Sequence, residues 1–210
     1  MLRVSELKLP LNHSEEQLRA ALADRLGVQA DDILDYEVFK RSYDARRKSD
    51  ILLIYQLDVS LGGSLEQQLL DSPERNSSIG PSPDTSYTLP ARADTDFPAA
   101  HQQRPVVIGF GPCGILAALL LAQMGLKPLV LERGQAVRQR TSDTWGLWRK
   151  RKLKTESNVQ FGEGGAGTFS DGKLYSQVKD KRHLGRKVLR EFVKAGAPEE
   201  ILTVSKPHIG

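Results

Sequence analysis

Three glycines in the middle of the chain have a spacing that suits the binding of a phosphate group. Gly109, Gly111 and Gly114 form the pattern G-x-G-x-x-G directly after the apolar residues 106–108. In such a loop the first glycine allows a tight exit from a strand, the second lets a diphosphate approach the backbone, and the third lets a helix pack closely on the sheet. The free N–H groups and the dipole at the start of the following helix favour a negatively charged group there.

An acidic residue stands at the end of the next apolar run. Glu132 closes the sequence PLVLE, about 20 residues after the glycine loop. A carboxylate at this place accepts two hydrogen bonds from ribose hydroxyls and repels a 2′-phosphate, which disfavours NADP here. Strand 106–108, helix 115–124 and the strand that ends at Glu132 therefore predict a βαβ unit of the Rossmann type. A glycine-rich turn in an ordinary α/β domain is the alternative.

A second glycine-rich segment, QFGEGGAGTFSDGKLYS at 160–176, raises the question of what it lies against. Glycine costs about 0.5 to 1 kcal/mol relative to alanine inside a helix or strand, so this composition indicates a backbone that another body approaches closely. An NAD-binding unit would continue into further βα repeats, whereas this chain continues into a charged helical stretch, 136–156, and then into this segment. That order favours FAD, with backbone N–H groups along the pyrophosphate and ring system.

These stretches carry a resemblance to a protein family. VVIGFGPCGILAALLLAQMGLKPLVLERG followed by ESNVQFGEGGAGTFSDGKLYS resembles the little-characterised family of FAD-dependent, NAD(FAD)-utilising dehydrogenases, in which a small βαββ domain precedes the flavin domain. The hairpin KRSYDARRKSD resembles that family's N-terminal module. The resemblance implies an oxidoreductase that binds FAD, with NAD(P)H as a candidate electron donor and a small molecule as substrate.

The resemblance also implies a set of cofactor-binding residues, while it leaves the catalytic residues and the substrate open. On the ADP half these are Gly109, Gly111, Pro112, Cys113, Gly114, Glu132 and Arg133. Nearer the pyrophosphate and flavin they are Gly164, Gly165, Ala166, Gly167, Thr168, Ser170 and Asp171.

Three of the side chains near these motifs have competing interpretations. Cys113 could have a redox or nucleophilic role at a helix N-terminus. The sequence shows no second cysteine and no paired histidine, so we favour a small buried side chain that only contributes to packing. Asp171 and Lys173 could tune the flavin, and Asp171 could equally cap a turn. His183 and His208 are isolated from other ligand types, so no metal site is expected.

A basic run, 149–152, stands beside Trp145 and Trp148. Basic residues with interleaved aromatics are the usual footprint of a nucleic-acid site. We favour a solvated helix end near the cofactor phosphates, so nucleic acid is not an expected partner.

The first part of the chain, residues 1–61, predicts a ferredoxin-like βαββ accessory domain. Residues 4–9, 35–42 and 51–61 have strand character, and the last of these alternates apolar and polar residues. Ser14 with Gln17 forms a capping-box pattern at a helix start. A partner or RNA could bind this module, although a solvated basic turn at 42–50 is the simpler interpretation.

Residues 62–104 have the composition of a flexible linker, and residues 105–210 contain the N-terminal part of the Rossmann-type FAD-binding domain. Two strands and a helix cannot close a doubly wound α/β sheet. We therefore expect an N-terminal fragment of a longer flavoprotein. The competing hypothesis is a non-catalytic truncated module that acts through partner or RNA binding.

Composition sets the remaining expectations. The chain has 210 residues, 39% hydrophobic and 27% charged, with a net charge of +4 and one cysteine. This profile is typical of a globular protein, and the lone cysteine excludes an intrachain disulfide, which indicates a reducing cytoplasm. The apolar run 115–122 is too short to span a bilayer, so no membrane association is expected. The oligomeric state does not follow from the sequence.

Overall fold

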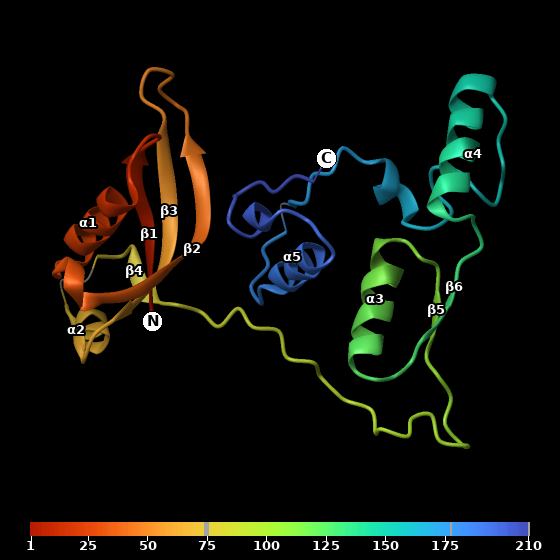
Figure 1. Ribbon diagram of the computed structural model, residues 1–210, viewed down its shortest axis with the longest axis horizontal. Coiled ribbons are helices and arrows are strands. Elements are labelled where there is room, and N and C mark those ends of the chain that lie inside the picture. The colour runs from red at the N-terminus through yellow and green to blue at the C-terminus, as the bar shows by residue number, and fades with distance from the viewer. Residues whose placement is uncertain (74–75, 177, 210) are drawn as a thin grey trace. The chain divides into compact units, whose positions relative to one another are not determined.

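The computed structural model describes residues 1–73, 76–176 and 178–209 and has a mixed α/β architecture (Figure 1). The chain divides into two compact units. One contains Met1–Ser86 together with Lys173–Ile209, and the other contains Tyr87–Gly172. The first unit holds an antiparallel sheet and the second a small parallel sheet.

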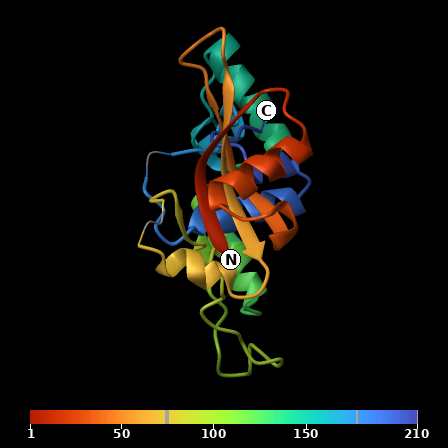
Figure 2. The same ribbon diagram turned by 90° about the vertical axis from the view of Figure 1, so that its left-hand side faces the viewer.

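The sheet of the first unit has the order β2-β3-β1-β4, with neighbouring strands antiparallel. Helix α1 packs against one face, as Figures 1 and 2 show. The elements are β1 (Leu2–Pro10), α1 (Glu15–Leu26), a 3-10 turn η1 (Ala30–Asp32), β2 (Ile33–Asp44), β3 (Leu52–Leu61), α2 (Leu65–Asp71) and β4 (Ile79–Pro81).

The core of this sheet follows from the alternation in its strands. In β3 the core-facing residues alternate with half-exposed ones, as the sequence predicts. Leu57 and Val59 of β3 are completely buried, as is Leu22 of α1. The capping box at Ser14 and Gln17 is also confirmed, because each side chain accepts a hydrogen bond from the other residue's backbone N–H.

Two elements lie within residues 62–104, where the sequence suggested a linker. Helix α2 places Leu65 and Leu69 against the core, and β4 pairs with the start of β1. Ile79 of β4 is buried in the same core. A polar composition hides these elements, because each contributes only a few apolar side chains.

The segment after the glycine-rich region packs against β2. It contains α5 (Leu184–Lys194) and a 3-10 turn η3 (Glu199–Leu202). The Arg41 N–H donates to the Thr203 carbonyl at 2.6 Å, and the Ser205 N–H donates to the Arg41 carbonyl at 2.9 Å. These bonds form a parallel bridge that covers part of an edge strand.

Phe39 of β2 provides a second anchor for this segment. The guanidinium carbons of Arg3 and Arg186 lie 3.4 and 4.4 Å from the centroid of its ring. Arg186 of α5 also donates to the Phe39 and Leu202 carbonyls, at 3.4 and 2.9 Å. Burial lowers the pKa of Arg186 below its ordinary value. These contacts explain why residues 173–209 group with the first unit, whereas the sequence placed them with the flavin domain.

The second unit contains a strand-helix-strand arrangement followed by a long helix. Its elements are β5 (Val106–Ile108), α3 (Pro112–Gln123), β6 (Leu129–Leu131), α4 (Val137–Lys150) and a 3-10 turn η2 (Gly165–Phe169). Strands β5 and β6 are parallel, in the register Val107 to Val130. In the described part of the chain, no helix is long and apolar enough to cross a membrane.

One face of the β5–β6 sheet is left open. Val107 faces α3, because a Cβ at Gly114 would lie 3.5 Å from its side chain. The alternate residues are exposed, and they are Val106, Ile108, Leu129 and Leu131. Parallel sheets are normally covered on both faces, whereas the described residues leave this face of the sheet exposed.

We predict that Ser205→Pro releases the C-terminal segment from β2, because proline has no N–H to donate to the Arg41 carbonyl. Amide hydrogen exchange should become faster in residues 201–209, while the amides of Leu57 and Val59 stay protected. Ser205→Ala keeps the N–H and is the matched control. Equal exchange in the two variants would show that this bond does not hold the segment.

Candidate functional site

The first glycine-rich loop connects β5 to α3 and is shaped by its glycines. Gly109 has a φ of +93°, which favours glycine, and Gly111 is the N-cap of α3. A Cβ added at Gly114 would lie 1.9 Å from the carbonyl oxygen of Gly109. The loop therefore depends on a close approach that only glycine allows at position 114.

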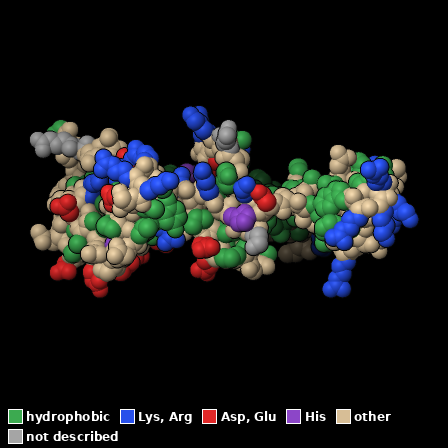
Figure 3. All heavy atoms as spheres, turned by 90° about the horizontal axis from the view of Figure 1, so that it is seen from above, with side chains coloured by type: hydrophobic (Ala, Val, Ile, Leu, Met, Phe, Trp, Pro, Cys, Tyr) green, Lys and Arg blue, Asp and Glu red, His purple; other side chains and the backbone are tan. Residues whose placement is uncertain are grey.

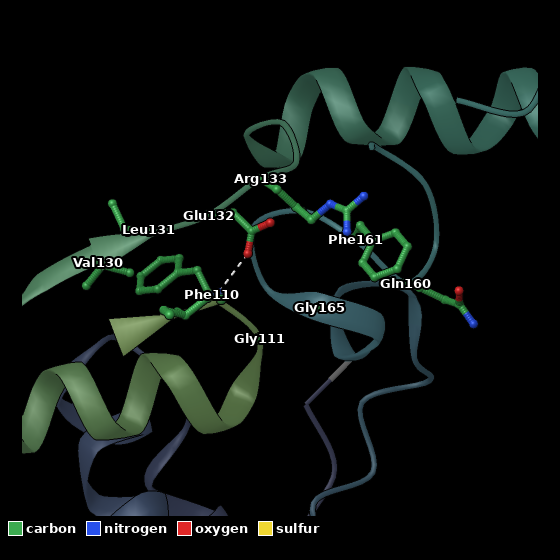
Figure 4. A pocket seen from close by; sticks show the side chains of 12 residues that line it. Phe110, Gly111, Val130, Leu131, Glu132, Arg133, Gln160, Phe161 and Gly165 are labelled. Atoms are coloured by element: carbon green, nitrogen blue, oxygen red, sulfur yellow. Dashed lines mark hydrogen bonds between the residues drawn. The ribbon is translucent and has the colours of Figure 1, made fainter. Parts of the chain in front are cut away.

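Glu132 lies directly after β6 and is tied to the backbone. Its Oε2 accepts a hydrogen bond from the Phe110 N–H at 2.7 Å, drawn in Figure 4, and its Oε1 accepts one from the Gly134 N–H at 2.8 Å. The Gly134 hydrogen bond is the main cause that lowers the pKa of this carboxyl below its ordinary value, against a smaller effect of burial. Both oxygens of Glu132 are thus held by backbone N–H groups at the end of the strand.

The second glycine-rich segment lies against the first loop. The Gly164 N–H donates to the Phe110 carbonyl at 2.8 Å. Gly165 has a φ of +59°, and a Cβ there would lie 2.9 Å from the Cα of Gly111. What this segment approaches is therefore another stretch of backbone in the same unit.

Arg140 of α4 has a side chain that is 0% exposed. Its guanidinium donates hydrogen bonds to oxygen atoms in and next to the glycine-rich segment. Its Nε donates to the Asn158 carbonyl at 2.8 Å, and its Nη2 to the Val159 carbonyl at 2.6 Å. Its Nη1 donates to the Glu163 carbonyl at 2.6 Å and to Thr168 Oγ1 at 3.1 Å. Burial lowers the pKa of the Arg140 guanidinium below its ordinary value.

A cleft of about 610 Å³ opens beside these loops, a size that suits a small organic ligand. Figure 4 shows Glu132 between an apolar group, Val130 with Leu131, and the side chains of Arg133 and Phe161. The lining residues come from both glycine-rich segments and both strands of the parallel sheet.

Of the residues expected to bind the cofactor, five line the cleft, namely Gly109, Gly111, Glu132, Arg133 and Gly165. The others lie in the first turn of α3 or in and around η2. They are Pro112, Cys113, Gly114, Gly164, Ala166, Gly167, Thr168, Ser170 and Asp171.

Cys113 requires a correction, because its side chain is exposed and is not a buried filler. The physical reason is its place in the first turn of α3. Its neighbour Gly114, rather than Cys113, faces the loop and β5.

Arg140, Phe110 and Phe161 were not expected to contribute to the site. Arg133 lies 4.6 Å over the Phe161 ring and makes a two-pronged ion pair with Glu156 at 2.5 Å. Arg140 stands in a stretch rich in basic residues, and the sequence carries no signal that separates the buried arginine from its exposed neighbours.

The aromatic and basic residues of α4 are mostly exposed to solvent. Trp145 and Trp148 are exposed and meet edge to face at 5.4 Å, with Arg149 over Trp145 at 4.3 Å. Figure 3 shows Lys and Arg side chains gathered over this helix. Lys154 pairs at 2.6 Å with the buried carboxylate of Asp143.

The two isolated histidines lie in the first unit, where His183 meets the Phe39 ring edge to face. Among the residues that the structure describes, no group of three His, Cys, Asp or Glu side chains could hold a metal ion.

Two known proteins or families are similar to this chain. Residues 1–60 match a family described as "Domain of unknown function (DUF8436)". The chain is also 40% identical over 211 residues to an "Uncharacterized protein" of Clostridium beijerinckii (strain ATCC 51743 / NCIMB 8052). That alignment covers 100% of this chain and 38% of the relative, so the chain spans well under half of the relative's length.

We predict that Gly165→Ala lowers the stability of the second unit by about 1 to 3 kcal/mol, because it adds a Cβ against the Gly111 backbone at a positive φ. Gly167→Ala is the matched control, since its Cβ would meet only Pro112 at an ordinary 3.5 Å. Both tryptophans lie in this unit, so urea unfolding followed by tryptophan fluorescence measures the difference. Equal stability of the two variants would contradict the close packing of the segments.

Proposed function

We propose that this chain is the N-terminal part of an FAD-dependent oxidoreductase, a dehydrogenase of the family that its sequence resembles. One observation carries the proposal. The second glycine-rich segment is hydrogen-bonded to the G-x-G-x-x-G loop, and both border one cleft with Glu132. This arrangement suits a dinucleotide whose diphosphate lies at a helix N-terminus and whose ribose meets a carboxylate.

The residues present fit the ADP half of FAD. Gly111 starts α3 without a side chain that would block a phosphate. Glu132 accepts hydrogen bonds from the backbone N–H groups of Phe110 and Gly134, and a carboxylate is the acceptor that ribose hydroxyls require. Bound FAD would supply the redox chemistry, while the chain's own residues bind and orient it.

The topology of the first unit supports a ferredoxin-like module that extends beyond the βαββ unit expected from the sequence. Its elements follow the order β1-α1-β2-β3-α2-β4, and its sheet order is 4-1-3-2 read from β4. Side chains of both helices belong to one core. Ferredoxin-like domains have the same β-α-β-β-α-β order of elements, which supports the proposal.

The open face of the parallel sheet supports a Rossmann-type domain that is incomplete in this chain. An exposed apolar face is formed, among the described residues, by Val106, Ile108, Leu129 and Leu131. Doubly wound sheets are covered on both faces. We infer that further strands and helices of a longer flavoprotein complete the sheet. The ring side of the flavin site, the catalytic residues and the small-molecule substrate would then depend on those parts.

Under this proposal NAD(P)H is the candidate electron donor and the protein acts in the cytoplasm. The alternative is a non-catalytic module that binds a partner or RNA through the N-terminal domain. One observation weighs against it. Phe39 on the sheet already contacts Arg186 of the chain's own C-terminal segment.

We predict that Glu132→Ala weakens FAD binding at least tenfold, because two charge-assisted hydrogen bonds of roughly 1.5 to 3 kcal/mol each would be lost. Fluorescence titration of FAD measures the affinity, and urea unfolding shows whether the variant is folded. Glu199→Ala, in the other unit, is the control. Undiminished FAD binding by folded Glu132→Ala would exclude Glu132 as the ribose ligand. If neither the unmodified chain nor the longer protein binds FAD, the proposed function is rejected.

A further inference from the structure

A chain of hydrogen bonds leads from the buried Arg140 to the carboxylate that borders the cleft. Arg140 Nη1 donates to the Glu163 carbonyl at 2.6 Å, and the next N–H, that of Gly164, donates to the Phe110 carbonyl at 2.8 Å. The N–H of Phe110 in turn donates to Glu132 Oε2 at 2.7 Å. Arg140 is thereby connected to Glu132 through two backbone segments.

The peptide group between Glu163 and Gly164 explains how this connection works. The C=O and N–H of a trans peptide point in opposite directions because the group is planar. When Arg140 binds the carbonyl on one side, it aims the Gly164 N–H at Phe110 on the other side. Gly164 has a φ of +84° and no Cβ to restrict rotation, so the hydrogen bonds must fix this plane.

The geometry of the guanidinium suits this task. Arg140 binds three backbone carbonyls and one hydroxyl with its forked donors, and it does so without exposure to solvent. Lysine has a single compact ammonium group on a flexible stem. It cannot reach carbonyls of Asn158, Val159 and Glu163 in the same arrangement.

We propose that Arg140 is a positioning residue for ribose recognition, which acts on Glu132 through Gly164 and Phe110 without touching the nucleotide. This inference rests on the proposed function, since it assumes that Glu132 accepts hydrogen bonds from ribose hydroxyls. Loss of the Arg140 contacts frees the 163–164 peptide, weakens its hold on Phe110 and leaves the Glu132 carboxylate less well aimed.

The test compares ADP with 2′-deoxy-ADP, measured by calorimetry on the unmodified chain and on Arg140→Lys. A ribose hydrogen bond to a carboxylate gives an expected preference for ADP of about tenfold, and Arg140→Lys should reduce it to about threefold or less. Arg138→Lys, an exposed arginine on the same helix, is the matched control and should keep the full preference. If Arg140→Lys weakens both nucleotides by one common factor and keeps the preference, Arg140 serves only stability and the inference is overturned.

A second measurement does not depend on nucleotide binding. In the nucleotide-free chain, Arg140→Lys should raise amide exchange at Phe110 and Gly164 by about tenfold or more, while Leu57 in the other unit is unaffected. Thr168→Val removes one acceptor of Arg140 and also the hydrogen bond from Thr168 Oγ1 to the Glu163 carbonyl, at 3.2 Å. This variant loosens the same peptide group if Arg140→Lys does not fold. If neither the unmodified chain nor the longer protein binds ADP, the proposed function fails. Unchanged exchange at Phe110 and Gly164 separately overturns the positioning role.

Discussion

The second unit depends on two backbone segments that approach each other with no side chain between them. Gly165 lies against Gly111 so closely that one added carbon would overlap the neighbouring backbone. The approach is maintained by Arg140, a buried cation, and burial of a charge is costly unless its hydrogen bonds are made. Here the guanidinium is satisfied by carbonyl and hydroxyl oxygens, and loss of their donor would cost roughly 1 to 3 kcal/mol for each buried oxygen left unpaired. The glycines therefore make the approach sterically allowed, and the arginine makes it favourable.

The first unit follows a different principle, because it has an apolar core of its own. Leu2, Leu22 and Leu57 are fully buried there. The C-terminal segment joins it through backbone bonds to the edge of β2 and through the stack of Arg186 on Phe39. Addition of backbone to a free strand edge is a general way to bind a segment. A module of this kind can hold a distant part of the same chain, which is a structural role that requires no external partner.

The sequence predicted those features whose determinants are local. The capping box at Ser14, the alternation in β3 and the order of β5, α3 and β6 before Glu132 each depend on neighbouring residues, and the structure contains all of them. The features it missed depend on distant partners. Strand β4 is a strand because β1 lies beside it, and Ser205 pairs with Arg41 far along the chain. The burial of Arg140 and the exposure of Cys113 likewise follow from packing between segments. The spacing of residue types along the sequence does not predict that packing.

Under the proposed function, Glu132 shows how the candidate site can be ordered before a nucleotide binds. An isolated surface carboxylate would rotate freely and would lose conformational entropy on binding a ribose. Glu132 is instead held by the Phe110 and Gly134 N–H groups, and these hydrogen bonds also lower the pKa of its carboxyl. Its orientation is thus set in advance by the folding of the two loops. One of those donors, Phe110, belongs to the loop between β5 and α3, so a change that moves this loop also moves the carboxylate. Under the proposed function, the places for phosphate and ribose are therefore coupled.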